Sequence, residues 1–187
     1  MILKRAVFID RDGTINEESG YLCKREDCRF IPGALEAIAQ LNKAGFLVVV
    51  ITNQSGIARG YYSAADLEQL HLHMAGEIAA AGGRIDGWYY CPHHPDYLAD
   101  SSQCDCRKPL PGMLQRAAHE LGIDLAASWM VGDKIADVSA GVAAGCQTIL
   151  VKTGYGAAEA LSAPEEPIIL DNFGAAAAFI IEQTLKE

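Results

Sequence analysis

The segment Val7–Thr14 (VFIDRDGT) places two aspartates two positions apart, directly after an apolar run. A turn needs only one aspartate, whereas two carboxylates at the end of a buried strand concentrate negative charge that calls for a cation. Gly13 and Thr14 follow, and they permit a tight turn. Asp10 and Asp12 are therefore candidates for metal binding and for nucleophilic or acid–base chemistry.

Three later segments supply groups that such chemistry needs. VVVITN contains Thr52, CRKP contains Lys108, and MVGDKIAD contains Asp133. Asp137 stands four residues after Asp133. A carboxylate that attacks a phosphate dianion brings like charges together, so a divalent cation, an ammonium group and a hydroxyl are needed to neutralise the phosphoryl oxygens. The set is suited to the hydrolysis of a phosphate monoester.

The segment from Cys91 to Pro109 (CPHHPDYLADSSQCDCRKP) concentrates soft metal ligands. C-x-H, ten residues and C-x-C predict a closed, structural zinc site with the ligands Cys91, His93, Cys104 and Cys106. A catalytic zinc keeps one position open for water, so we reject that role. His94 is an alternative to the favoured His93, and free thiols or a Cys104–Cys106 disulfide are the alternative to zinc.

The remaining cysteines and two further histidines show no ligand pattern. We expect Cys23, Cys28 and Cys146 to be plain thiols. His71 and His73 lie in a predicted helix, where a core or solvent-facing role is expected rather than a metal-binding one.

Apolar strands alternate with amphipathic helices along the chain. We predict strands at 6–10, 46–53, 85–91, 128–133, 147–151 and 168–170, and helices at 32–45, 63–83, about 111–121, 135–144 and the C-terminal end. This order predicts an α/β fold, a Rossmann-like three-layer domain over residues 1–187 with a mostly parallel sheet. Ligands bind outside the carboxyl ends of such strands, where Asp10, Thr52, Cys91 and Asp133 stand.

Composition limits the class of protein. The chain has 187 residues, 50% of them hydrophobic, and a net charge of −9, which argues against binding nucleic acid or anionic membrane by bulk electrostatics. The first apolar run stops at Asp10, too early for a signal peptide, and the longest apolar runs are too short to span a bilayer. We expect a cytoplasmic monomer, in which six cysteines serve as metal ligands or thiols.

In the order D-x-D-G-T, T, K and G-D-x-x-x-D, the motifs resemble the haloacid dehalogenase superfamily of phosphatases. The resemblance implies that Asp10 is the nucleophile, that Asp12 is the general acid and base, and that Thr52 and Lys108 stabilise the phosphoryl group. It also implies Mg²⁺ held by Asp10, Asp133 and the backbone carbonyl of Asp12. The gaps between motifs leave no room for a folded lid, so we expect a capless member.

CPHHP…CDCRKP together with TNQSGIARG (52–60) resembles the D-glycero-D-manno-heptose 1,7-bisphosphate phosphatases, which remove the 7-phosphate during synthesis of nucleotide-activated heptose for lipopolysaccharide core or surface glycans. Histidinol-phosphate phosphatases share the zinc loop and stay the alternative. A zinc-bearing nucleic-acid-binding module or a DNA 3′-phosphatase is disfavoured by the acidic balance.

A sugar bisphosphate needs further cations and polar groups. Arg107 is the best candidate for the distal phosphate, because a guanidinium grips oxygens bidentately, and Arg59 or Arg11 are weaker candidates. The resemblance adds these substrate contacts: Glu18, Ser19, Gly20, Tyr21, Asn53, Gln54, Ser55 and Lys134. We expect the zinc-clamped loop to deliver Arg107 and Lys108 to the phosphates beside Asp10.

Overall fold

The computed structural model describes residues 3–97, 104–161 and 167–184. In this part of the chain, all strands belong to one parallel sheet with the order β3-β2-β1-β4-β5-β6. The strands are β1 Ala6–Ile9, β2 Leu47–Asn53, β3 Gly87–Cys91, β4 Trp129–Gly132, β5 Gln147–Val151 and β6 Ile168–Leu170. The prediction of a mostly parallel sheet is confirmed.

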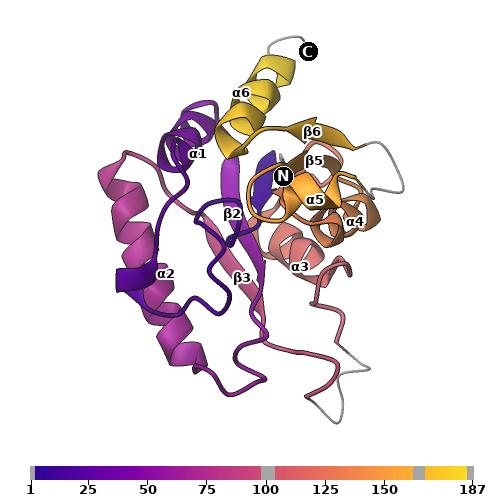
Figure 1. Cartoon of the computed structure of the whole chain (residues 1–187). Coiled ribbons are helices and arrows are strands. Elements are labelled where there is room, and N and C mark those ends of the chain that lie inside the picture. Colours follow the sequence, from indigo (N-terminus) through magenta and orange to yellow (C-terminus); the bar gives the residue numbers. More distant parts are fainter. Residues whose placement is uncertain (1–2, 98–103, 162–166, 185–187) are drawn as a thin grey trace.

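Helices cover both faces of the sheet, which gives the predicted three layers (Figure 1). The α-helices are α1 Ala34–Lys43, α2 Ala64–Ala80, α3 Gly112–Leu121, α4 Ile135–Ala144, α5 Gly156–Glu159 and α6 Phe173–Thr184. The helices α1, α2 and α6 pack on one face, and α3 and α4 pack on the other. Among the described residues, no helix is both long and apolar enough to cross a membrane.

The two-residue period of β1 divides the core. Val7 and Ile9 belong to the cluster under α1, α2 and α6, whereas Ala6 and Phe8 belong to the cluster under α3 and α4. All four side chains are completely buried. This explains why the strand reads as a continuous apolar run rather than an alternating one.

The predicted elements lie within two or three residues of the observed ones. The bounds of α4, β5 and β6 agree, and Ser63 caps α2 as predicted, with its hydroxyl accepting from the Asp66 N–H. Two short helices escaped prediction, the 3-10 helix η1 (Arg25–Asp27) and α5. Neither is long enough to show a helical period in the sequence.

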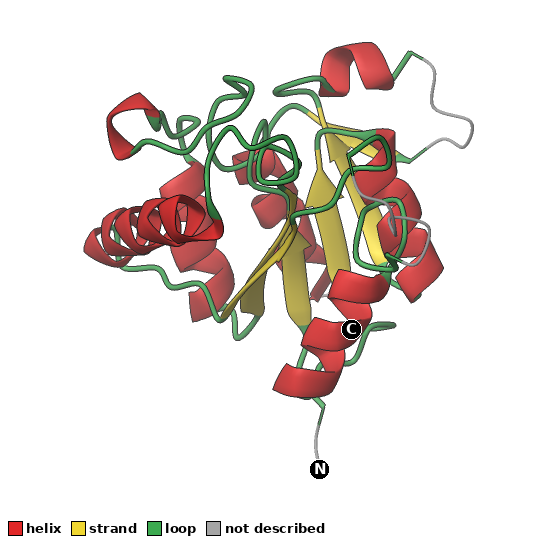
Figure 2. Cartoon of the chain, turned by 90° about the horizontal axis from the view of Figure 1, so that it is seen from below, coloured by secondary structure: helices red, strands yellow, loops and turns green. Residues whose placement is uncertain are grey.

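The order of the sheet reverses beside β1. The chain runs outward from β1 to β2 and β3, then returns to place β4, β5 and β6 on the opposite side of β1. The carboxyl ends of β1 and β4 therefore meet at a switch point, where α/β sheets bind ligands. Figure 2 shows long loops gathered at one edge of the sheet.

Candidate active site

Asp10 follows β1 at the switch point and opens a tight turn. The N–H groups of Ile15 and Asn16 both donate to the Arg11 carbonyl, at 2.9 and 3.2 Å. Gly13 has φ +85°, and a Cβ at this position would lie 2.2 Å from Asp133 Oδ2. Glycine is therefore required here both by the backbone conformation and by the approach of the β4 carboxylate.

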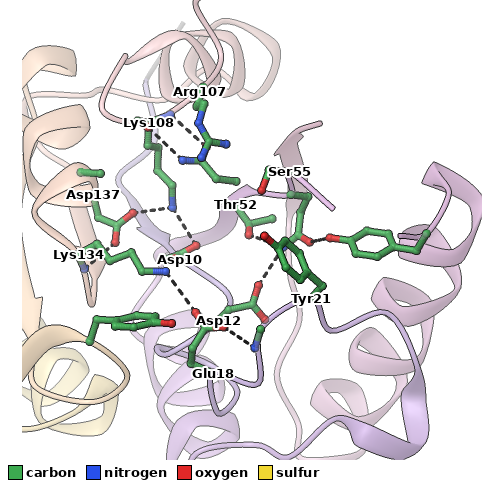
Figure 3. A pocket seen from close by; sticks show the side chains of 16 residues that line it. Asp10, Asp12, Glu18, Tyr21, Thr52, Ser55, Arg107, Lys108, Lys134 and Asp137 are labelled. Carbon is green, nitrogen blue, oxygen red and sulfur yellow. Dashed lines mark hydrogen bonds and ion pairs between the residues drawn. The ribbon is translucent and has the colours of Figure 1, made fainter. Parts of the chain in front are cut away.

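Lys108 lies at the centre of the site. Its Nζ is 2.8 Å from Asp10 Oδ1 and 2.6 Å from Asp137 Oδ1, and it donates to the Ile51 carbonyl at 2.7 Å. Figure 3 shows the ammonium group between the two carboxylates. The side-chain amide of Asn53 donates to the Lys108 carbonyl at 3.0 Å and accepts from the Lys108 N–H at 3.1 Å. The end of β2 thus fixes the backbone that carries this lysine.

Three buried carboxylates form a candidate magnesium site. Ligand atoms of Asp10, Asp133 and Asp137 lie within 4.8 Å of one another. Asp133 Oδ2 accepts from the Tyr155 N–H at 2.8 Å, but Oδ1 is buried and has no hydrogen-bond partner among the described residues. An orphaned carboxylate oxygen among hard oxygen donors fits Mg²⁺. The Asp12 carbonyl stays a predicted ligand, and Asp137 is already paired with Lys108.

The pKa values of these buried carboxylates show that neighbouring groups neutralise their negative charge only in part. Burial raises the pKa of Asp10 to about 6, although Lys108 opposes the change. Burial and the neighbouring Asp10 raise the pKa of Asp133 to about 8. Both shifts describe a site that gains from a cation, because a bound divalent ion favours the ionised carboxylates.

The Asp12 carboxylate is held by a set of donors. Arg11 Nη2 donates to Oδ1 at 3.0 Å and to Oδ2 at 2.8 Å, Asn16 Nδ2 donates to Oδ1 at 2.9 Å, and Gln54 Nε2 donates to Oδ2 at 2.9 Å. Burial alone would raise the pKa of Asp12, but the Arg11 guanidinium and these hydrogen bonds lower it. Arg11 is completely buried, so its suggested role as a substrate cation was wrong.

His71 contacts Arg11 on the side away from Asp12 and is buried. Of the two roles expected for it, core and solvent-facing, the core role is the one observed. Its Nε2 is 3.3 Å from Arg11 Nη1 and its ring stacks on Trp88 with centroids 4.4 Å apart. Guanidinium groups only donate, so Nε2 accepts and the imidazole is neutral. Burial and Arg11 lower the pKa of His71 to about 3.

A cavity of about 400 Å³ opens above Asp10 and Asp12. The predicted residues that line it are Glu18, Gly20, Tyr21, Thr52, Asn53, Gln54, Ser55, Arg107, Lys108 and Lys134, and Tyr62, Ala136, Asp137 and Tyr155 join them. Ser19 is described but does not line the cavity. Its role as a substrate contact stays a prediction.

Two cations reach the cavity from different elements (Figure 3). Arg107 comes from the loop after Cys106, and its Nη1 donates to the His93 carbonyl at 3.0 Å. Lys134 precedes α4, and its Nζ lies 3.2 Å from Glu18 Oε2 and 4.5 Å from the centre of the Tyr155 ring. The cavity therefore offers positive charge beyond that of Lys108.

The four predicted zinc ligands converge. His93 Nδ1 lies 3.0 Å from Cys104 Sγ and 3.4 Å from Cys106 Sγ, and Cys91 Sγ lies 3.6 Å from Cys104 Sγ. Bonds of about 2.3 Å to a tetrahedral zinc separate sulfur ligands by about 3.8 Å, so the donor set fits Zn²⁺. The Cys104–Cys106 sulfur separation of 2.9 Å is too long for a disulfide, and both cysteines are free.

The neighbouring histidine has a different partner. His94 Nε2 lies 2.8 Å from Arg59 Nη2, and Arg59 Nη1 donates to the Tyr97 hydroxyl at 2.9 Å. The choice of His93 over His94 is thus supported, and Arg59 does not line the cavity. Residues 98–103 of the predicted zinc loop lie outside the described residues.

Several site residues were not found from the sequence. Asp137 was noted without a role, and the partners of Asp12, namely Arg11 and Asn16, carry no signal beyond their position in the turn. Tyr62 had no signal at all, although it hydrogen-bonds to Gln54 in the cavity wall. The contacts of Asp12 and of Tyr62 depend on how the chain folds, so the sequence alone does not predict them.

The strand order and this carboxylate–lysine site define a phosphatase of the haloacid dehalogenase superfamily, and a family model described as HAD-hydrolase-like matches residues 105–176. The chain is 50% identical over 154 residues to the D-glycero-beta-D-manno-heptose-1,7-bisphosphate 7-phosphatase of Pasteurella multocida, covering 81% of this chain and 84% of that protein. The chain belongs to this family of heptose bisphosphate phosphatases.

Two further comparisons agree over a longer part of the chain. The Pseudomonas aeruginosa protein of the same name is 44% identical over 178 residues, which are 94% of this chain and 97% of that protein. A crystal structure of the D,D-heptose 1.7-bisphosphate phosphatase from B. bronchiseptica, complexed with magnesium and phosphate, has a TM-score of 0.87 and 37% identity. It covers 96% of this chain and 99% of that one. The relatives therefore match the whole sheet and not the motifs alone.

Proposed function

We propose that this chain hydrolyses the 7-phosphate of D-glycero-β-D-manno-heptose 1,7-bisphosphate, in the synthesis of nucleotide-activated heptose. The observation that carries the proposal is the convergence of Asp10, Lys108 and Asp133 at the switch point, below a cavity with additional cations. The names of the family members supply the sugar and its anomer.

Asp10 is the nucleophile of the proposed reaction. Its Oδ1 accepts from the Arg11 N–H at 2.8 Å and contacts Lys108, which leaves Oδ2 for attack on phosphorus. The new bond joins Oδ2 to phosphorus, and the bond from phosphorus to the sugar oxygen breaks with its electron pair on that oxygen. Lys108 and the Thr52 hydroxyl neutralise the phosphoryl oxygens. A bound Mg²⁺ would supply further charge neutralisation, held by Asp10, Asp133 and the Asp12 carbonyl.

Asp12 serves both halves of the reaction. In its protonated form it donates a proton to the leaving sugar oxygen. In its ionised form it takes a proton from the water that attacks the aspartyl-phosphate, which releases inorganic phosphate and restores Asp10. The donors around its carboxylate favour the ionised form, which suits the second half.

The distal phosphate is assigned to Arg107 and Lys134. Both line the cavity, and neither forms an ion pair with Asp10 or Asp137, the carboxylates that pair with Lys108. Glu18 pairs with Lys134, so a bound phosphate competes with or joins this contact. Because the cavity offers two cations for a second phosphate, a bisphosphate is favoured as the substrate over histidinol phosphate, which carries one phosphate and an amine.

Zinc is assigned a structural role in the loop from Cys91 to Cys106. The loop carries Arg107 and Lys108 directly after its last ligand, so a fixed loop places both cations. A cytoplasmic location and a monomeric state remain parts of the proposal that rest on the sequence alone.

The test is a kinetic comparison of both anomers of the heptose bisphosphate with histidinol phosphate, measured as phosphate release. We expect the highest kcat/KM for the β-anomer. A higher kcat/KM for histidinol phosphate than for either heptose bisphosphate would refute the assignment. Asp10→Asn should abolish turnover, and Asp171→Asn is its matched control, since Asp171 contacts only the exposed Lys152 among the interactions described. Full turnover by Asp10→Asn would disprove the role of the nucleophile.

A further inference from the structure

The side-chain amide of Gln54 links one buried tyrosine to two groups of the active site. Its Nε2 donates to Asp12 Oδ2 and to Thr52 Oγ1, both at 2.9 Å. Its Oε1 accepts from the Tyr62 hydroxyl at 2.5 Å. Gln54, Thr52 and Tyr62 are 3%, 1% and 7% exposed, so water competes little for these bonds. A continuous hydrogen-bonded chain therefore runs from Tyr62 to the reacting groups.

The chemistry of the partners fixes the direction of each bond. An ionised carboxylate only accepts, so the amide nitrogen must face Asp12 and the amide oxygen must face Tyr62. Tyr62 is then the donor, in agreement with burial that raises its pKa to about 12. Thr52 Oγ1 accepts from Gln54, which leaves its own hydrogen to be donated to a phosphoryl oxygen. The Asp12 carboxylate thus sets the direction of the hydrogen bonds along this chain, and Tyr62 completes it as the donor to the Gln54 amide oxygen.

Gly56 makes room for this arrangement. A Cβ on Gly56 would lie 2.2 Å from Cε1 and 2.8 Å from the hydroxyl oxygen of Tyr62. Such distances are far inside van der Waals contact, so any larger residue would displace the phenol ring. The glycine in QSGIARG is accounted for by the need to seat Tyr62 against the backbone.

We propose that Tyr62 is a positioning residue for phosphoryl transfer. Its O–H holds the Gln54 amide, which in turn aims the Asp12 carboxylate and the Thr52 hydroxyl. The Gln54 side chain, predicted as a substrate contact, then serves the reacting groups instead of the sugar. The proposal rests on the phosphatase chemistry proposed above and is independent of the identity of the sugar.

Tyr62→Phe tests the role, because it keeps the ring and removes only the donor. We expect kcat to fall about tenfold and KM to stay within about twofold, the size of one buried hydrogen bond. Tyr89→Phe is the matched control, since its hydroxyl donates to Glu120 at 2.7 Å in another part of the fold. It should keep the kcat of the unchanged protein. Gly56→Ala should reproduce the loss by displacing the ring.

A double substitution decides whether Tyr62 acts through Gln54. In a Gln54→Leu background, Tyr62→Phe should cause no further loss of kcat. The assays use the heptose bisphosphate and p-nitrophenyl phosphate in parallel. If the unchanged protein hydrolyses only the aryl ester, the sugar assignment fails and the role of Tyr62 is still decided on that ester. A kcat for Tyr62→Phe within twofold of the unchanged protein, an effect confined to KM, or a full further loss in the Gln54→Leu background would overturn the inference.

Discussion

Without magnesium, the protein should become less stable as the pH rises from 6.5 to 8.0, and Asp133 should be the main cause. Its pKa is raised by burial from an ordinary value of 3.8 to about 8, so the folded state binds the proton more tightly than the unfolded state between these values. Stability from this group is present at low pH and is lost as the pH rises through the folded pKa. Asp10 shares the direction, but most of its contribution falls below pH 6.

The magnitude follows from the shift. A fully bound proton changes the free energy of unfolding by about 1.4 kcal/mol per pH unit, but the folded Asp133 is only half protonated at pH 8, so the change from pH 6.5 to 8.0 is roughly 1.5 kcal/mol. For a chain of this size, that corresponds to a fall in Tm of roughly 3 to 6 °C. His71 has the opposite sign, since its pKa is lowered from 6.5, but its stability is lost only as the pH falls below 6.5. The chosen window therefore separates the two groups.

The assay is thermal unfolding in magnesium-free buffer across this window, with zinc content checked by metal analysis. Asp133→Asn keeps an oxygen that can accept from the Tyr155 N–H but cannot ionise, so its Tm should be nearly independent of pH. Added Mg²⁺ should flatten the curve of the unchanged protein, because a cation replaces the proton, and should not affect the variant. A Tm of the unchanged protein that is flat or rising with pH, or an equal slope in Asp133→Asn, would refute the reasoning.

Three further predictions concern the cations and the zinc loop. Lys108→Met should lower kcat about a hundred- to a thousandfold in steady-state assays, because the phosphoryl oxygens lose a charged donor; a loss under tenfold would contradict its central place. Arg107→Gln should raise KM for the bisphosphate about ten- to a hundredfold but leave p-nitrophenyl phosphate unaffected; equal effects on both would remove it from the distal phosphate. Cys106→Ser should lose zinc in metal analysis and lose about tenfold to a hundredfold in kcat/KM for the bisphosphate, because Arg107 is displaced; zinc-free protein with full activity would disprove the clamp.

The sheet and the main site were predictable because both depend on local signals. Asp10 and Asp133 each follow a buried apolar run, and parallel strands must bring their carboxyl ends to one edge. Cys91 and Cys106 belong to a ligand spacing that few other structures require. These inferences needed no knowledge of how distant side chains pair.

What the sequence did not reveal depends on pairing across the fold. The contact of Lys108 with Asp137 joins residues that are far apart in the chain, and both had other credible partners. Arg11 stands between two aspartates, yet nothing in the sequence says whether its guanidinium faces the cavity or the core. His93 and His94 have almost the same spacing, and only the folded chain distinguishes them: His93 lies among the three cysteines, whereas His94 contacts Arg59.

The loop that carries Lys108 is fixed at two independent points, and this determines how much zinc can matter. At its start, the Gln54 N–H donates to the Cys91 carbonyl at 2.8 Å, which joins the end of β3 to the loop after β2. At its end, the Asn53 amide forms two hydrogen bonds with the Lys108 backbone without any metal ligand. Arg107 instead bonds to the His93 carbonyl, so its position depends on the zinc cluster itself. Zinc loss should therefore disturb Arg107 more than Lys108, and Cys106→Ser should impair the bisphosphate reaction more than the hydrolysis of p-nitrophenyl phosphate.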